Sequence, residues 1–398
     1  MDGQKNYKKT RTACYLGFVT QAILANFTPL LFLTFKNTYG IGLDRIALIP
    51  LVFYFTQLLV DIASAAFVDK IGYRVCVVSA QALSAAGLAL MAVLPELLPV
   101  PFAGILAAVM LYAMGSGLIE VLVSPIIEAC PFENKDGMMS LLHSFYCWGA
   151  VAVILGSTLF FAAFGMASWK ALTLLWALVP LYNTWNFITC PIERLVEDGE
   201  GVPAVRLLRS PLFWLLILLM VCAGASELSM AQWASAFTES AVGVSKTAGD
   251  LAGPCLFAVL MGASRVLYGK MSERLNLTRT MLVCGILCVI CYLMAALSAS
   301  PAIALAGCAL CGLSVGILWP GVIRVSSQRC PGGGTAMFAC LALGGDFGAT
   351  VGPAMVGGIS DLAGGGLRTG LLASAAFPMI LCLGLIALSR SFGGASKD

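Results

Sequence analysis

The sequence predicts an all-α membrane protein with twelve transmembrane helices in two pseudo-symmetric six-helix bundles. Its 398 residues are 60% hydrophobic and only 11% charged, whereas soluble domains usually carry about 25% charged residues. The apolar residues gather in stretches of about 20 or more, which is the length that an α-helix needs to cross a bilayer. Helix breakers such as Pro131 separate most of these stretches, so most connections are short.

The twelve candidate spans cover nearly the whole chain. They run over residues 12–36, 46–68, 74–95, 101–128, 137–164, 168–190, 211–238, 249–271, 279–299, 301–328, 334–361 and 367–390. The longest polar connection, residues 191–210, follows the sixth span and is predicted to be a cytoplasmic linker. We therefore expect an N-terminal bundle over residues 1–190 and a C-terminal bundle over residues 211–398.

The positions of the charged residues predict the orientation. Most of the 23 Lys and Arg residues fall on the side of the N-terminus, and such an excess marks cytoplasmic loops. We expect both termini in the cytoplasm and the chain in the plasma membrane, the inner membrane of a bacterial cell. His143 is the only histidine, and no metal cluster, phosphate-binding loop or nucleophile constellation appears. We expect no cofactor, no nucleic-acid partner and no enzymatic activity.

Carboxylates inside the spans are the strongest functional signal. A charge within the bilayer is costly unless it faces a partner or water, so it marks a solute or ion pathway. In span four, Glu120 belongs to a strip of polar residues that recur at every fourth position. The other members are Tyr112, Ser116, Ser124 and Glu128. Four residues make about one helical turn, so the strip follows one face of the helix.

Two further carboxylates lie near the middle of their spans. Glu227 falls in span seven, and Asp346 falls in span eleven within the run GGDFGATVGP. Small residues of this kind allow close helix approach. The sequence therefore predicts three mid-depth acids.

The two halves carry matching features. Residues 69–74 follow span two, and residues 269–274, which carry a related Lys and Arg pattern, follow span eight. Pro125 and Pro320 fall at similar offsets in spans four and ten. Together these matches indicate two related six-helix bundles.

The chain resembles the major facilitator superfamily over nearly its whole length. The signature between spans two and three is present as Asp69, Gly72 and Arg74, although Ala65 replaces the usual glycine before it. A partial second copy is found at Gly269, Glu273 and Arg274. The resemblance implies transport by alternating access, with spans one, four, seven and ten lining a central cavity.

Within that superfamily the chain is similar to the fucose permease–like sugar symporters. The features that carry this similarity are the Gly-x-Gly-x-x-Glu run ending at Glu120, Pro125, the stretch LLHSFYCWGAV around His143 and Gly149, and the spacing of Glu227 and Trp233. These symporters are expected to carry an acid in span one. Residues 26–29 here are Asn-Phe-Thr-Pro, so a proton would use another acid.

A sugar site needs groups that match hydroxyls and an apolar ring face. The candidates for solute binding are Gln21, Asn26, Glu120, Glu227, Gln232, Trp233 and Trp319. The candidates for proton coupling, which needs a carboxyl that loads and unloads near neutral pH, are Asp346, Glu120 and Glu227. We assign Glu120 and Glu227 mainly to solute binding. We assign coupling mainly to Asp346, which is expected beside the cavity.

The remaining polar residues predict gates and conformational contacts. These are Asp61, Asp69, Gly72, Arg74, Glu128, His143, Arg265, Glu273, Arg274 and Arg324. Asp61 and Arg265 occupy matching positions in the two halves, so we expect them to pair when the cytoplasmic side is closed. Asp69 is expected to bridge neighbouring helix ends, with Arg74 as a partner.

Three functions remain open from the sequence. The first is proton-coupled import of a small polar solute, such as a monosaccharide, by a monomer in the lipid bilayer. The second is export of drugs or other organic solutes, which the three mid-depth acids disfavour. The third is a receptor or scaffold that does not transport, which the absence of long loops disfavours.

Overall fold

The computed structural model describes residues 6–41, 45, 48–195, 202, 204–240, 251–362 and 366–391. Part of the predicted linker, including Glu197, Asp198 and Glu200, lies outside the described residues. Every regular element within these ranges is a helix, which confirms the all-α prediction.

The helices of the first half match the predicted spans closely. They are α1 (Tyr7–Asn26), η1 (Thr28–Leu31), α2 (Phe32–Tyr39), α4 (Leu48–Ile71), α5 (Tyr73–Leu97), α6 (Pro101–Ala129), α7 (Lys135–Phe164), η2 (Met166–Ser168) and α8 (Trp169–Thr189).

The helices of the second half also match the predicted spans. They are α9 (Ala204–Leu207), α10 (Pro211–Ser240), η3 (Leu251–Cys255), α12 (Leu256–Met271), α13 (Leu277–Leu297), α14 (Pro301–Val315), α15 (Leu318–Arg329), α16 (Gly334–Leu362), α17 (Leu367–Ser374) and α18 (Ala376–Ser391). Among the described residues, nine helical segments are long and apolar enough to cross a membrane. Span two, α4, carries a shorter apolar segment, Leu51–Ser64.

Three spans that the sequence predicts as continuous are interrupted. Span one breaks between α1 and η1 ahead of Pro29, span ten breaks at residues 316–317 ahead of Pro320, and span twelve breaks at Ala375 ahead of Pro378. Proline has no N–H to bond the carbonyl four residues earlier, and its ring crowds that carbonyl. The breaks therefore fall where the sequence removes a helical hydrogen bond.

Packing divides the chain into two compact units, which we describe separately. Unit 1 comprises Met1–Pro131, Phe145–Gly201 and Gly334–Ala339, and unit 2 comprises Phe132–Ser144, Val202–Gly333 and Cys340–Asp398. Unit 1 thus includes the first turns of α16, and unit 2 includes the first turns of α7. The boundary between bundles at residues 191–210 stays a prediction.

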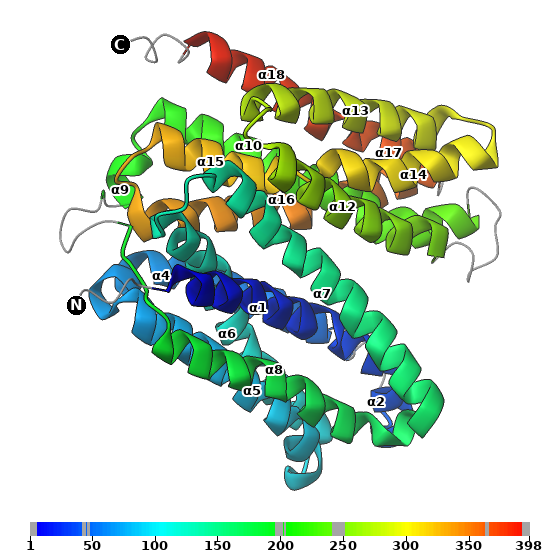
Figure 1. Cartoon of the computed structure of the whole chain (residues 1–398). Coiled ribbons are helices and arrows are strands. Elements are labelled where there is room, and N and C mark those ends of the chain that lie inside the picture. The colour runs from blue at the N-terminus through cyan, green and yellow to red at the C-terminus, as the bar shows by residue number, and fades with distance from the viewer. Residues whose placement is uncertain are drawn as a thin grey trace, which may run out of the picture. The chain divides into compact units, whose positions relative to one another are not determined.

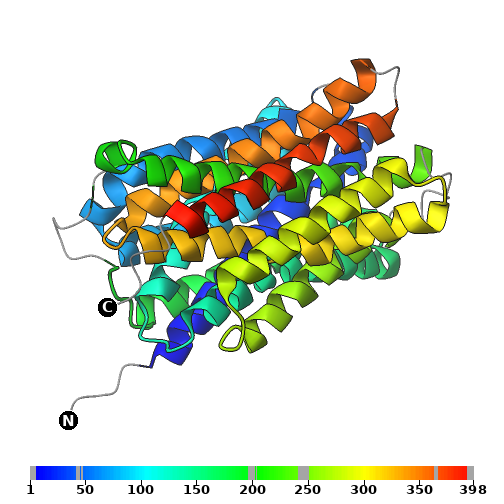
Figure 2. The same ribbon diagram turned by 90° about the horizontal axis from the view of Figure 1, so that it is seen from above.

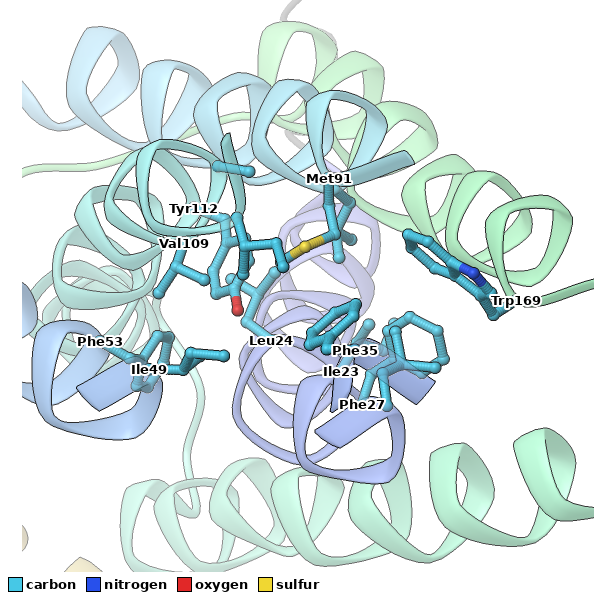
Figure 3. Close-up of a cluster of buried hydrophobic side chains, with 14 of the residues drawn as sticks. Ile23, Leu24, Phe27, Phe35, Ile49, Phe53, Met91, Val109, Tyr112 and Trp169 are labelled. Atoms are coloured by element: carbon cyan, nitrogen blue, oxygen red, sulfur yellow. The ribbon is translucent and has the colours of Figure 1, made fainter. Parts of the chain in front are cut away.

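Unit 1 is built around α6. This helix packs against α1, α4 and α5, and α5 also packs against α8 (Figure 1). Buried apolar side chains from these helices meet in the cluster of Figure 3, where Leu24 of α1 lies near Tyr112 of α6. Phe27, the residue after α1, lies beside Phe35. Phe35 of α2 packs edge-on against Trp169 of α8, with ring centroids 5.5 Å apart.

Unit 2 has a similar helical arrangement. Helices α13 and α14 lie side by side, as the two yellow helices of Figure 2 show. Helix α14 also packs against α12, and α10 packs against α18. Many apolar side chains of both units are exposed, among them Leu159, Leu181 and Val283, as expected for helices that face lipid.

Helices α5 and α6 approach each other through glycine. A Cβ atom on Gly87 would lie 2.6 Å from Tyr112 Cβ and 2.7 Å from the Tyr112 backbone nitrogen. Gly115 of α6 makes a similar approach, because a Cβ atom there would lie within 3 Å of Ser84 and Ala80 of α5. Close packing of backbones is a main source of stability between helices in lipid.

We expect Gly87→Ala to lower the free energy of unfolding by about 1–3 kcal/mol, because overpacking forces the two helices apart. The control is Gly358→Ala, at an exposed helical glycine with nothing within 4 Å of the added atom. That change should be neutral or stabilising by up to about 1 kcal/mol. Thermal unfolding of the purified variants in detergent measures both. Equal stability of the two variants would contradict the packing argument.

Candidate functional site

Glu120 is the centre of a polar cluster inside unit 1. Its Oε2 atom accepts hydrogen bonds from Gln21 Nε2 and Gln57 Nε2, each at 2.7 Å. Ser116, one turn before Glu120 on α6, donates to Gln57 Oε1 at 2.9 Å. This bond fixes which end of the Gln57 amide faces the carboxylate. Helices α1, α4 and α6 therefore each supply one side of the cluster.

The polar strip predicted on α6 faces α1 and α4. The Tyr112 hydroxyl lies 2.8 Å from Thr28 Oγ1 at the break in span one, and Ser124 and Glu128 continue the strip as buried residues. Glu120 itself is only partly buried. The strip brings polar groups together within an otherwise apolar unit.

Asn26 lies at the C-terminal end of α1, beside this cluster. Its side-chain amide donates to the Ala22 carbonyl at 2.9 Å, and its side chain interacts with the Tyr146 hydroxyl of α7. Both side chains are partly buried. Tyr146 thus brings an aromatic ring and a hydroxyl next to two of the predicted solute-binding residues.

Asp61 lies one turn beyond Gln57 on α4 and is fully buried. Gly117 makes room for it, because a Cβ atom there would lie 3.1 Å from Asp61 Oδ1. Unit 1 therefore contains a second carboxylate on the same side of α4 as Gln57. Sequence reasoning missed Gln57; the signal for it was its position one turn before Asp61 in an apolar span.

Unit 2 contains an ion pair within its spans. Arg265 Nη2 of α12 lies 3.2 Å from Glu227 Oε2 of α10. The same guanidinium donates from Nε to the Gly316 carbonyl at 2.7 Å and from Nη1 to the His143 carbonyl at 3.0 Å. Arg265 is 3% exposed. The pairing of Arg265 with Asp61 across the halves stays a prediction.

The predicted aromatic residues of unit 2 pack against α16. Trp233 Nε1 donates to the Pro353 carbonyl at 2.9 Å, and Trp319 covers Gly345. Asp346 follows Gly345 and is partly buried, and its carbonyl accepts from Thr350 Oγ1 at 2.8 Å. Gln232 is exposed. Both indole rings thus fill space that glycines of α16 leave open.

The signature residues of unit 1 connect helix ends. Thr335 Oγ1, in the first turn of α16, donates to Asp69 Oδ1 at 2.6 Å and lies 2.8 Å from the Tyr73 hydroxyl. Gly72 has φ +99°, which non-glycine residues rarely adopt. Asp69 thus links the last turn of α4 to the first turn of α16.

Arg74 was expected to be a partner of Asp69, but its guanidinium bonds the end of α8. Its Nη1 atom donates to the carbonyls of Phe187 at 2.9 Å and Ile188 at 2.7 Å. These carbonyls belong to the last turn of α8, where helical carbonyls lack intrahelical donors and a positive charge is favourable. Arg74 therefore caps α8, and Arg194 lies beside Gly72.

Unit 2 repeats this arrangement with the first turns of α7. Asn134 Oδ1 accepts from Ser272 Oγ at 2.9 Å, and Asn134 Nδ2 donates to Glu273 at 3.4 Å. Arg324 Nε donates to Asp136 Oδ1 at 2.5 Å. Glu273 and Arg274 are exposed. The start of α7 thus contacts the α12–α13 junction and α15.

The described residues contain no group of three or more His, Cys, Asp or Glu side chains placed to hold a metal ion. The polar clusters are instead built from single carboxylates with amide, hydroxyl or guanidinium partners.

Comparison with known proteins supports the membrane-transport interpretation. Residues 13–353 match the family model of the Major Facilitator Superfamily. No curated protein matches the chain. Among solved structures, the E. coli fucose:proton symporter FucP superposes with a TM-score of 0.81 at 15% identity, covering 96% of this chain and 98% of that one.

Two other solved structures are similar. The proton:xylose symporter XylE, bound to 6-bromo-6-deoxy-D-glucose, has a TM-score of 0.77 at 13% identity and covers 97% of this chain and 95% of its own. The human organic anion transporter TETRAN has a TM-score of 0.76 at 16% identity and covers 96% of this chain and all of its own, 100%. At these identities the similarity shows the fold.

We expect Asp69→Asn to slow solute turnover several-fold while leaving equilibrium affinity unchanged, because Asp69 bridges helix ends and lies outside the Glu120 cluster. Thr335→Val is the matched variant, since it removes the same hydrogen bond from the other side. Transport rates and equilibrium binding of both variants, and of the double variant, test this. A large loss of affinity with normal turnover, or fully additive effects in the double variant, would contradict it.

Proposed function

Because the chain belongs to the Major Facilitator Superfamily and is a transporter, we propose that it imports a small polar solute, of the monosaccharide type, together with a proton. The two halves alternately expose a site near the middle of the membrane. We further propose that it works as a monomer in the plasma membrane with both termini in the cytoplasm.

The observation that carries this proposal is the Glu120 cluster. The amides of Gln21 on α1 and Gln57 on α4 both lie within hydrogen-bond distance of the Glu120 carboxylate on α6. Carboxylates and amides accept from and donate to hydroxyl groups, so a solute with several hydroxyls is able to replace the bonds among them. The partly buried position of Glu120 favours exchange with a solute over a permanent structural role.

The surroundings of the cluster support a solute with an apolar ring face. Tyr146 lies beside Asn26, and Tyr112 and Phe53 pack with ring centroids 5.7 Å apart. Aromatic rings stack against the C–H face of a sugar while polar groups bond its edge. Fucose and xylose, which relatives of the same fold transport, are the first solutes to test.

The deciding experiment reconstitutes the purified protein in liposomes. Uptake of labelled L-fucose, D-xylose and other monosaccharides is measured with and without a pH gradient in which the outside is acidic and the inside is alkaline. We expect at least one sugar to accumulate above its outside concentration, and dissipation of the gradient to abolish accumulation. Uptake of organic anions or cationic drugs, and of no sugar, would overturn the proposal.

We expect Glu120→Gln to reduce net sugar accumulation by about 10-fold to 100-fold, since losing a partner for buried polar groups costs about 1–3 kcal/mol. Glu96→Gln is the matched control, because it neutralises an exposed acid that pairs with Lys170 at a helix end. The control should transport normally. Normal rate and normal accumulation in Glu120→Gln would remove Glu120 from both binding and coupling.

A further inference from the structure

The break in span ten leaves one backbone carbonyl without its helical donor. In a continuous helix the carbonyl of Gly316 would accept from the N–H of residue 320, but residue 320 is proline. In a bilayer no water replaces that bond, and an unsatisfied backbone group is costly. The side chain of Arg265 fills this position, since Nε donates to the Gly316 carbonyl at 2.7 Å.

Arg265 joins this carbonyl to two other helices. Its Nη1 atom donates to the His143 carbonyl of α7, and Nη2 pairs with the Glu227 carboxylate of α10. Ser140 of α7 donates to the backbone carbonyl of Arg265 at 2.8 Å. One guanidinium therefore holds α7, α10 and the proline break of span ten together.

The charge of Glu227 contributes to the stability of this arrangement. The guanidinium and the carboxylate are 4% and 12% exposed. Neutralising an acid that pairs with a buried cation removes part of the stabilisation of that cation, so a neutral Glu227 favours movement of Arg265 away from its position in the ion pair. Such movement would leave the Gly316 carbonyl without a donor and loosen the break.

We propose that Glu227 is the proton-coupling carboxylate and that Arg265 is the positioning residue that connects its charge to the proline break of span ten. This inference rests on the proposed proton-coupled transport. One proton adds to the carboxylate and neutralises it, Arg265 keeps its charge, and the same proton leaves when the pair re-forms. Acid therefore loosens the break, and alkaline conditions tighten it.

Several titratable or charged groups lie on the elements packed around Glu227. Arg265 is its ion-pair partner from α12, and His143 of α7 lies against Arg265. Tyr292 of α13 donates to the carbonyl of Ser226 at 2.8 Å, and α16 carries Asp346. His143 and Asp346 are therefore the rival origins of a pH response.

Hydrogen exchange tests the inference without any solute. The purified protein in lipid nanodiscs is followed by mass spectrometry at about pH 8 and about pH 6, where a buried carboxyl is able to titrate, with correction for intrinsic exchange. In the wild type we expect exchange of peptides spanning residues 311–323 to rise by about tenfold on acidification. Glu227→Gln should show the high rate at both pH values.

Matched variants separate Glu227 from its neighbours. His143→Gln, Asp346→Asn and the exposed control Glu96→Gln should keep the wild-type pH response. Arg265→Lys keeps the charge but has no Nε–H for Gly316, so it should exchange quickly at both pH values. A pH response that survives Glu227→Gln, or that disappears in Asp346→Asn instead, would overturn the inference.

A second variant covers failure of Glu227→Gln to fold. The double variant Glu227→Gln/Arg265→Gln removes both charges, so it should fold and exchange independently of pH; a pH-dependent double variant would overturn the inference. In liposomes with L-fucose or D-xylose, Glu227→Gln should lower pH-driven accumulation of the sugar at least about tenfold. Unchanged accumulation contradicts the inference. If the wild type transports no sugar, the proposed function is wrong. The hydrogen-exchange experiment still decides the role of Glu227 in that case.

Discussion

Each charge or freed carbonyl in the interior of this protein has to find a partner within the protein, because the bilayer core offers no water. The neighbourhood of Gly316 shows how strictly this applies. Pro320 removes an amide donor, Arg265 supplies a donor in its place, and Glu227 balances the charge that Arg265 brings. Polar groups with partners on other helices therefore come in connected sets. A change to one member alters the free energy of the others.

The same constraint shapes the Glu120 cluster. Gln21 and Gln57 both donate to one carboxylate oxygen, and Ser116 fixes the orientation of Gln57. Neutral amides stabilise the charge without cancelling it. A solute with hydroxyl groups is able to compete for such bonds, whereas an ion pair like that of Glu227 responds chiefly to charge. The two units therefore hold carboxylates in chemically different settings.

Glycines set how close the helices come, and this closeness places the polar groups. Helices α5 and α6 meet at Gly87 and Gly115, and Gly117 lets Asp61 lie against α6. At the helix ends, the first turn of α16 contacts Asp69, and the start of α7 contacts the corresponding junction of the second half through Asn134. The repeated pattern agrees with two related halves. It also gives both signature regions a role in connecting helix ends.

The sequence by itself determined the positions of the apolar helices and of the acids within them. A membrane span is a property of about 20 consecutive residues, and the helices begin and end within a few residues of the predicted positions. Only the tertiary structure decided the partners: Gln57 with Glu120, Arg265 with Glu227, and Arg74 with the end of α8. These bonds join residues that are far apart in the chain. Their formation depends on how helix faces meet, and no local apolar pattern encodes that.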